Sequence, residues 1–359
     1  MRPTGTSRTQ IMSDVAARAG VSHQTVSRVV NGHANVAPRT RARVERAIAE
    51  LGYRPNIAAR ALVTGSTRTI GLATMHLDQY GPAQTLIGLE KAAREAGYSL
   101  SVAILDHVTA GDMRDAVDRL VAQGIDAVVA LNTYDAAEEA LGRLGPPVPL
   151  VTVEAGRDSG RASVGVDQEA GARLATRHLL DLGHRTVHHI AGPTDSQEAR
   201  ARVAGWRAEL DDVHAPVPGY DSGDWTPASG YAAGERLVAL IRGGEPVSAV
   251  FVANDQMGLG LLAALHRAGL RVPDDVSVVG FDDLPEAPYF TPPLTTVRQD
   301  FAELGRRGVQ LLLALLGGEE PHLDPVPPTL VVRSSTGPAT QKRYTHDHNV
   351  DGRRSGAVR

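Results

Sequence analysis

The feature of this 359-residue chain that most restricts its fold is a regular alternation of strand-length apolar runs with helix-length stretches, which begins at Thr69. Alternating strands and helices form parallel sheets that are covered by helices on both faces. Because so many strands over about 270 residues exceed one compact domain, the pattern predicts two doubly wound α/β lobes. The apolar runs lie at Ile70–Thr74, Leu100–Leu105, Ala127–Leu131, Leu150–Val153, Val187–Ala191, Ala249–Ala253 and Val276–Phe281. The helical stretches span 84–96, 112–123, 168–182, 198–210, 228–242, 256–268 and 300–316.

A different pattern precedes Thr69, in the stretch from Asp14 to Leu62. In DVAARAGVSHQTVSRVVNG, apolar residues recur at helical spacing and are interrupted once by Gly20. This spacing is typical of a helix-turn-helix, although a purely structural helical hairpin would have the same pattern. Ser22 is suited to cap the second helix. The front of that helix would expose side chains that can bond to bases or phosphates, namely His23, Gln24, Thr25, Ser27 and Arg28.

The charge of the chain is distributed unevenly. Residues 1–66 hold ten Arg and three acidic residues, which gives this segment a net charge of +7, whereas the whole chain carries −4. The remaining residues therefore carry −11. A basic N-terminal segment joined to an acidic body is typical of a nucleic-acid-binding domain attached to a separate globular body. The charge thus favours the DNA-binding interpretation of the two short helices.

Followed by VAPRTRARVERAIAELGYRPNIAARAL, the helix-turn-helix stretch resembles the DNA-binding domain of the lactose/galactose repressor family. The resemblance continues through SQEARARVAGW, SGDWTPASGY, ANDQMGLG and FDDLPEAPYFTPPLTTVRQDF. It implies an all-α helix-turn-helix domain over 1–55, a hinge helix and linker over 56–66, and a periplasmic-binding-protein-like body over 67–337. One lobe would comprise about 67–166 with 298–328, the other about 167–297 with 329–337. Residues 338–359 would be a disordered tail.

Within the N-terminal domain, the first helix is expected near Met12–Ala19, with Ile11 or Ser13 at its N-cap. A third helix is expected from Pro38 to about Leu51, since proline is favoured at the first helical position. Asn56 is a good cap for a short hinge helix near Ile57–Val63, for which the alternative is a flexible tether. The resemblance implies that Leu62 enters the minor groove of DNA. The complete set of expected DNA contacts is Ser22, His23, Gln24, Thr25, Ser27, Arg28, Asn31, Asn56, Ala59, Arg60 and Leu62.

In the body, polar side chains follow several predicted strands. Ligands of open α/β sheets bind beyond the carboxyl ends of the strands, and Glu154, Asn254 and Asp282 lie at such ends. Arg202 and Trp225 lie in the connecting segments. This combination suits a sugar, whose hydroxyls need paired donors and acceptors and whose apolar face can stack on an indole.

The resemblance implies that Arg202, Asn254 and Asp282 bind sugar hydroxyls, that Trp225 packs on the ring, and that Glu154 is another acceptor. In MHLDQYGP, Gln79 and Pro82 are expected to contact the substituent of the sugar, and Gln79 departs there from the apolar residue of the family pattern. Each residue has a structural alternative: Asn254 and Asp282 as loop caps, Trp225 as core, and Arg202 and Glu154 as solvated surface groups. Asp255 and Asp283 are expected to be structural, as are the clustered histidines His184, His188 and His189.

Several classes of protein are disfavoured by the sequence. The chain has no Cys, and MRPTGTSRTQ lacks the apolar run of a signal peptide. No stretch approaches the ~20 apolar residues of a membrane span, so a cytoplasmic location is expected. We find no P-loop, metal-binding motif or nucleophile–base arrangement, so we expect no enzyme activity, metal or cofactor. The tail carries no leucine heptad of the kind that joins some relatives into tetramers, so a homodimer is expected.

The sequence therefore predicts a transcriptional repressor that binds a pseudo-palindromic operator as a homodimer. Its operator affinity would be lowered by a sugar, with a galactoside expected, bound between the lobes. Two alternatives stay open at this stage. One is a regulator whose ligand, such as a purine, strengthens DNA binding, and the other is a sugar-binding protein without repressor activity.

Overall fold

The computed structural model describes residues 10–30, 35–53, 65–105, 109–131, 134–142, 148–154, 161–319 and 322–339. The chain divides into two units, an N-terminal unit up to Thr67, called the head here, and a body from Arg68 onward. The hinge helix expected over 56–66 and the tail expected from 338 fall largely outside the described residues. No helix among the residues described above is both long enough and apolar enough to cross a membrane.

The described part of the head contains three helices around one small core. The core is built from apolar side chains that the helical spacing had indicated, including Val15, Val26 and Val44, each with no exposed surface. Gly20 ends the first helix with a φ of 63°, a left-handed conformation that glycine adopts without strain. The three helices are α1 (Met12–Ala19), α2 (His23–Val30) and α3 (Pro38–Leu51).

The helix starts in the head follow the expectations closely. Ser22 caps α2, because its Oγ accepts a 3.2 Å hydrogen bond from the backbone N–H of Thr25. Ile11 rather than Ser13 is the N-cap of α1, and it offers no side-chain acceptor. Instead the Asp14 carboxylate accepts a 2.9 Å bond from the Ile11 N–H. Pro38 occupies the first turn of α3, as expected.

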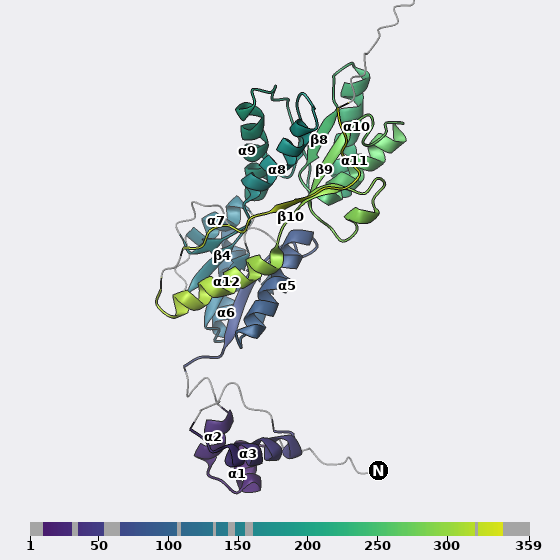
Figure 1. The fold of residues 1–359 in the computed structure, drawn as a ribbon. Helices are drawn as coiled ribbons and strands as arrows, with labels where there is room; N and C mark the ends of the chain where they lie inside the picture. The colour runs from purple at the N-terminus through teal and green to yellow at the C-terminus, as the bar shows by residue number, and fades with distance from the viewer. Residues whose placement is uncertain are drawn as a thin grey trace, which may run out of the picture. The chain divides into compact units, whose positions relative to one another are not determined.

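The first lobe of the body is a five-stranded parallel sheet in the order β2-β1-β3-β4-β5. Helices α5 and α12 cover one face and α6 and α7 the other, and each face has its own apolar cluster (Figure 1). The strands are β1 (Thr69–Thr74), β2 (Ser99–Ile104), β3 (Ala127–Leu131), β4 (Leu150–Val153) and β5 (Ser163–Val164). The helices are α5 (Tyr80–Glu95), α6 (Ala110–Ala122), α7 (Asp135–Gly142) and α12 (Phe301–Leu316).

The second lobe is a six-stranded sheet in the order β11-β10-β9-β8-β6-β7, parallel except for β11. Helices α8 and α9 pack on one face and α10 and α11 on the other (Figure 1). Its strands are β6 (His188–Ala191), β7 (Asp221–Ser222), β8 (Ala249–Val252), β9 (Ser277–Asp282), β10 (Thr295–Arg298) and β11 (Thr329–Val331). Its helices are α8 (Gln168–Asp181), α9 (Gln197–Asp212), α10 (Pro227–Arg242), α11 (Asp255–Arg267) and the short 3₁₀ helix η1 (Ala287–Tyr289).

Three segments connect the lobes, and they set the geometry between them. The chain leaves the first sheet after β5 and enters α8, returns between β10 and α12, and crosses again after α12 to reach β11. The first and third of these crossover segments touch through a parallel bridge between Val166 and Val326. The predicted fold of two doubly wound lobes is confirmed.

Helices α5 and α12 approach each other at two glycines. A Cβ atom on Gly305 would lie 2.2 Å from the carbonyl carbon of Gly88, and one on Gly88 would lie 2.3 Å from the carbonyl oxygen of Phe301. Both contacts are with backbone, which cannot rotate away as a side chain can. Only glycine at both positions therefore permits this helix crossing.

We expect Gly305→Ala to lower the free energy of unfolding of the body by about 1–3 kcal/mol, the usual cost of overpacking. Gly111→Ala is the matched control, since that glycine is in helix α6 with only the Thr109 hydroxyl, 3.6 Å away, near its added Cβ. The control should be neutral or stabilising by up to about 1 kcal/mol. Urea unfolding followed by circular dichroism measures both, and equal effects would contradict the packing argument.

Candidate functional site

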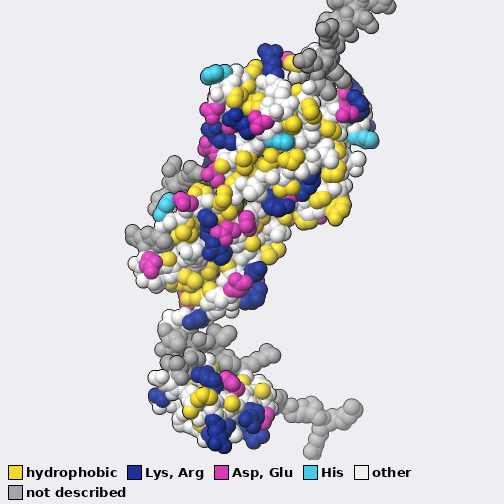
Figure 2. Space-filling model, viewed as in Figure 1, with side chains coloured by type: hydrophobic (Ala, Val, Ile, Leu, Met, Phe, Trp, Pro, Cys, Tyr) yellow, Lys and Arg dark blue, Asp and Glu magenta, His cyan; other side chains and the backbone are white. Residues whose placement is uncertain are grey.

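The front of helix α2 presents a polar surface with no apolar side chain exposed. Ser22, His23, Gln24 and Arg28 are exposed, and Thr25 and Ser27 are partly buried. The described part of the head also exposes Arg18, Arg39, Arg43 and Arg46, and dark blue side chains are visible across the head in Figure 2. The surface is therefore basic and rich in hydrogen-bonding groups. The other expected DNA contacts, Asn31, Asn56, Ala59, Arg60 and Leu62, lie outside the described residues.

In the body, six of the seven residues expected to bind a sugar line one small cavity between the lobes, which we call the inner cavity. Gln79 and Pro82 reach it from the first lobe, and Arg202, Trp225, Asn254 and Asp282 from the second. Its volume is about 30 Å³, which is the space of one water molecule. The remaining lining residues are Tyr80, Gly81, Glu198, Gln256, Gln299 and Phe301.

A closed ring of polar side chains borders the inner cavity, which three of its four members, Arg202, Asp282 and Gln299, line. Arg202 Nε donates to Gln168 Oε1 at 3.0 Å, and Gln168 Nε2 donates to Gln299 Oε1 at 2.8 Å. Gln299 Nε2 then donates to Asp282 Oδ1 at 2.7 Å, and Asp282 Oδ1 lies 3.8 Å from Arg202 Nη2. Gln168 and Gln299 lie on two of the crossover segments. The ring therefore links the candidate ligand contacts to the connection between the lobes.

Arg202 is held from every side. Its side chain is 3 % exposed, and its guanidinium carbon lies 3.9 Å from the ring centre of Phe281 and 5.4 Å from that of Trp225. Nη1 also donates to the carbonyl oxygen of Ala253. The alternative in which Arg202 is a surface charge is therefore wrong. An arginine has five N–H donors, so this fixed group can still offer a donor to the inner cavity.

Three of the candidate ligand contacts have a backbone conformation that is costly for non-glycine residues. The φ angle is 66° at Glu154, 72° at Trp225 and 103° at Asp282. Positive φ values cost about 1–3 kcal/mol and gather at functional sites, where the surrounding structure imposes them. Three such residues around one cleft mark it as a candidate functional site.

Asn254 and Trp225 combine structural and cavity-lining roles. Asn254 Oδ1 caps α11 by accepting a 2.9 Å bond from Met257 N, and its Nδ2 donates to the Trp225 carbonyl at 3.2 Å. Trp225 is 7 % exposed and packs on Gly192, where an added Cβ would lie 2.3 Å from the indole. The structural alternatives for these two residues therefore hold alongside their place in the cavity wall. That they contact a sugar stays a prediction.

Asp255, Asp283, His184 and His189 have structural roles, as the sequence predicts. Asp255 accepts bonds from Thr296 Oγ1 at 2.6 Å and Leu284 N at 2.9 Å, and Asp283 pairs with Arg298 and Arg333. His184 bonds to Ser248 and Ser277, and buried His189 bonds through Nδ1 to the Phe251 carbonyl. Among the described residues, no group of three His, Cys, Asp or Glu side chains has the geometry to hold a metal ion.

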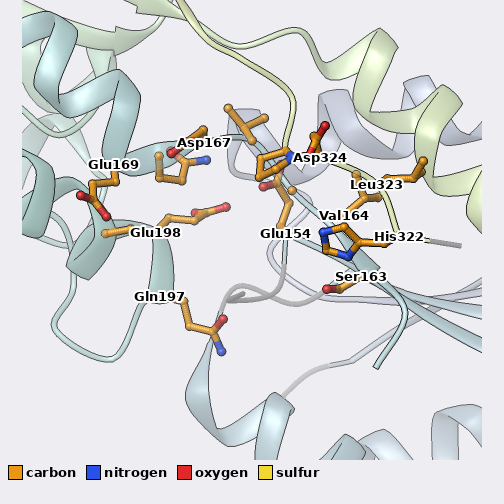
Figure 3. Close-up of a pocket in the computed structure, with 15 residues that line it drawn as sticks. Glu154, Ser163, Val164, Asp167, Glu169, Gln197, Glu198, His322, Leu323 and Asp324 are labelled. Carbon is orange, nitrogen blue, oxygen red and sulfur yellow. The ribbon is translucent and has the colours of Figure 1, made fainter. Parts of the chain in front are cut away.

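Glu154 is the one expected contact that does not line the inner cavity. It lines an adjacent and larger cavity of about 440 Å³, which we call the outer cavity. Figure 3 shows Glu154, from the end of β4, and Glu198, from the first turn of α9, extending toward each other across it. The Glu154 side chain is buried, so the alternative of a solvated loop end is wrong.

Sequence reasoning missed Glu198, Gln168 and Gln299. Glu198 lies two residues after the Ser196 N-cap of α9, where an acidic residue is expected for favourable interaction with the helix dipole. Gln168 and Gln299 lie next to helix starts and have no distinctive pattern. Their roles depend on crossover segments that meet only in the folded body.

Burial and neighbouring charges shift the pKa values of the carboxyl groups in the cleft. Burial raises the pKa of Asp282 to about 6, against the lowering effects of Arg202 and the hydrogen bond from Gln299. Burial also raises the pKa of Glu154, and the nearby charge of Glu198 raises it further. The pKa of Glu198 is raised to about 7, chiefly by burial, with Arg202 opposing and Asp282 adding to the shift.

A small helix-turn-helix domain on a two-lobed body with a polar cavity at the lobe junction defines a ligand-responsive DNA-binding regulator. Residues 11–56 match the family described as bacterial regulatory proteins, lacI family, and residues 176–336 match the periplasmic binding protein-like domain. The lactose operon repressor of Escherichia coli K12 is 36 % identical over 91 % of both chains.

A second relative, the ribose operon repressor of the same strain, is 35 % identical over 84 % of this chain and 92 % of its own. A crystal structure of the lac repressor dimer bound to operator and the anti-inducer ONPF has a TM-score of 0.81. It is 35 % identical in sequence and covers 92 % of this chain and all of that one. The chain belongs to the lacI family of bacterial regulatory proteins, and is a helix-turn-helix, DNA-binding repressor with a sugar-binding body.

The raised pKa of Glu198 predicts how stability depends on pH. A carboxyl whose pKa is higher in the folded than in the unfolded state costs stability as the pH rises above the unfolded value, here 4.5. Glu198→Gln removes that cost. At about 1.4 kcal/mol per pKa unit, we expect the variant to be more stable than the parent by roughly 2–3 kcal/mol at high pH.

The difference in the free energy of unfolding between Glu198→Gln and the parent should narrow as the pH falls and vanish near pH 4.5. Urea unfolding at a series of pH values measures it. Glu235→Gln, at an exposed position of α10, is the matched control and should have little effect. A stability difference that is the same at every pH would show that the Glu198 carboxylate is not desolvated.

Proposed function

We propose that a sugar bound in the inner cavity lowers the affinity of this repressor for operator DNA. The observation that carries the proposal is the ring formed by Arg202, Gln168, Gln299 and Asp282. A ligand that bonds to Arg202 and Asp282 alters the hydrogen bonds of this ring. Two other members of the ring, Gln168 and Gln299, lie where crossover segments join helices α8 and α12. Ligand chemistry is thereby coupled to the geometry between the lobes.

The donors and acceptors of the inner cavity favour a neutral polyhydroxyl ligand. Arg202 supplies donors, Asp282 supplies acceptors, and Gln79 and Gln256 line the same cavity with side-chain amides that supply both. Trp225 and Phe301 add aromatic surface. Sugar hydroxyls need both kinds of partner, and a pyranose has an apolar face. The named relatives include a lactose and a ribose operon repressor, so the galactoside assignment rests on the residue set of this chain.

The closed geometry supports induction by a change in lobe arrangement. An inner cavity of about 30 Å³ cannot hold a monosaccharide, so the sugar must bind an arrangement with the lobes further apart. A ligand that binds one arrangement better shifts the population toward it. In the proposed mechanism this shift separates two hinge segments, around 56–66, of a homodimer, and so weakens their hold on the centre of a pseudo-palindromic operator.

Operator binding in the presence of ligands tests the proposal. Operators are first selected from a random DNA library with the full chain, and affinity is then measured by fluorescence anisotropy with galactosides, other sugars and purines. We expect a galactoside to weaken binding by about 5–150-fold, the range for typical couplings of 1–3 kcal/mol. Tightening by a purine would support a co-repressor, and a failure to select any operator would overturn the repressor assignment.

Arg202→Lys isolates the ring from the rest of the cleft. Lysine keeps the charge but cannot bond to Gln168 and Ala253 through a planar fork while stacking on Phe281. We expect normal operator affinity and at least about a tenfold loss of sugar affinity, equivalent to 1.4 kcal/mol. Arg207→Lys, at an exposed position of the same helix, is the control. Unchanged sugar binding in Arg202→Lys would rule out the inner cavity as the ligand site.

Arg28→Ala tests the reading helix. If Arg28 contacts a base edge, its loss should cost about 1–3 kcal/mol on the selected operator and relax sequence preference at one position. Arg46→Ala, which removes the same charge from an exposed position of α3, should weaken binding to all sequences more evenly. Sugar affinity should be unchanged in both variants. Equal loss of sugar and operator binding in Arg28→Ala would show that the reading helix is misassigned.

A further inference from the structure

A third hollow lies on the second lobe alone, between helix α9 and the edge strand β7, and we call it the edge groove. Its volume is about 330 Å³, within the roughly 300–1,000 Å³ range of small-molecule sites. It shares no lining residue with the inner or the outer cavity. Every residue assigned to its wall lies in the continuously described stretch 191–222.

The floor and one wall of the edge groove come from the ends of two strands. Ala191 at the end of β6 pairs with Ser222 at the end of β7, and both line the groove. The ring of Tyr220 lies beside them, held edge-on against the buried Trp206 at 6.0 Å between ring centres. The groove therefore lies at the carboxyl ends of parallel strands, where ligands of open α/β sheets bind.

The opposite wall is one face of α9, along which positive charge and apolar surface alternate. Arg200 and Arg207 line the two ends of this face, and Val203 and Ala204 line it between them. Seven residues of helix separate the arginines by about 10.5 Å along the helix axis. Among the described residues that line the groove there is no Asp or Glu, although residues 67–359 together carry −11. A cationic hollow on an acidic body concentrates anions.

The two arginines differ in what they already bind. Arg207 is exposed and forms no ion pair within the described part of the chain. Arg200 forms the two-point ion pair with Asp135 of the first lobe, with N–O distances of 2.7 and 2.5 Å. Both partners of that pair are about half exposed, so the pair contributes only about 0–1 kcal/mol. An acidic group of a ligand can therefore replace Asp135 at Arg200 at little cost.

We propose that the edge groove binds a small dianion whose two acidic groups are joined by an apolar middle. One acidic group pairs with Arg207 and the other with Arg200, while the apolar middle lies against Val203 and Ala204. Carboxylate and phosphate groups both accept paired hydrogen bonds from a guanidinium, so either can supply the charge. The site is distinct from the proposed sugar site. A ligand there removes one contact between the lobes, because Asp135 belongs to the first lobe.

Calorimetry on the full-length protein tests the edge groove with three six-carbon probes that differ only at their ends. Adipate carries two carboxylates, hexanoate carries one and hexanediol carries none. Butanediol bisphosphate replaces the carboxylates by phosphates, and inorganic phosphate tests whether a lone anion suffices. We expect the better of the two dianions to bind at least about tenfold more tightly than hexanoate, hexanediol or inorganic phosphate.

Arg207→Gln should bring the affinity for that dianion to within about threefold of that for hexanoate. Arg185→Gln is the matched control, since it removes the same charge from an exposed position before β6, at the end of the strand away from the groove. It should change nothing. Asp135→Asn should tighten dianion binding by about two- to fivefold, because the competitor for Arg200 loses its charge.

Two results would overturn the dianion site. One is a dianion that binds the parent no more tightly than the other probes, and the other is a dianion that binds Arg207→Gln as tightly as the parent. Unchanged dianion binding in Asp135→Asn would overturn the competition for Arg200 alone. Circular dichroism of each variant checks that the fold is intact.

Discussion

The guanidinium of Arg202 is a full positive charge almost completely removed from water, and the arrangement of the cleft depends on how that charge is compensated. Desolvating such a group costs several kcal/mol unless it is paired and hydrogen-bonded. Asp282 provides the opposite charge at 3.8 Å, Gln168 and the Ala253 carbonyl accept hydrogen bonds, and Phe281 lies against the guanidinium face. No one of these contacts would suffice, because each satisfies a different part of the same group.

The residues that compensate the charge of Arg202 also join the candidate ligand contacts to the segments that connect the two lobes. Other contacts hold the lobes together at the rim, where Asp135 and Arg200 form a two-point ion pair and Tyr134 bridges to Ser196. Asp135 and Arg200 are about half exposed, and exposed ion pairs contribute only about 0–1 kcal/mol. Under the proposed function, a ligand that bonds to Arg202 and Asp282 needs to contribute only a few kcal/mol to outweigh this exposed ion pair.

Sequence periodicity predicted the elements that are long and regular. β1 and α12 have clear patterns, whereas β5 and β7 are two residues long and too short for any period to appear. The helix α7 and the strands β10 and β11 were also missed, and β11 is only three residues long and pairs antiparallel with β10. The rule that ligands bind at the carboxyl ends of strands correctly predicted that Asn254 and Asp282 face the cleft, because a strand end can be recognised from the neighbouring sequence alone. Gln168 and Gln299 could not be found that way, because their hydrogen bonds join residues 17 to 131 positions apart in the chain. Glu198 lies at a helix start rather than at a strand end.

The placement of Glu154 is the most informative departure from the expectation. The sequence predicts all seven contacts at one site between the lobes, yet Glu154 lines a second cavity, opposite Glu198. Burial raises the pKa of both carboxyls, and the charge of Glu198 raises that of Glu154 further, which lowers the stability of the folded protein at neutral pH. Hydroxyl donors placed between them would stabilise the ionised forms and recover part of that cost only when ligand is present. Under the proposed function, this unfavourable pair contributes binding free energy to a ligand whose hydroxyl groups reach both carboxyls.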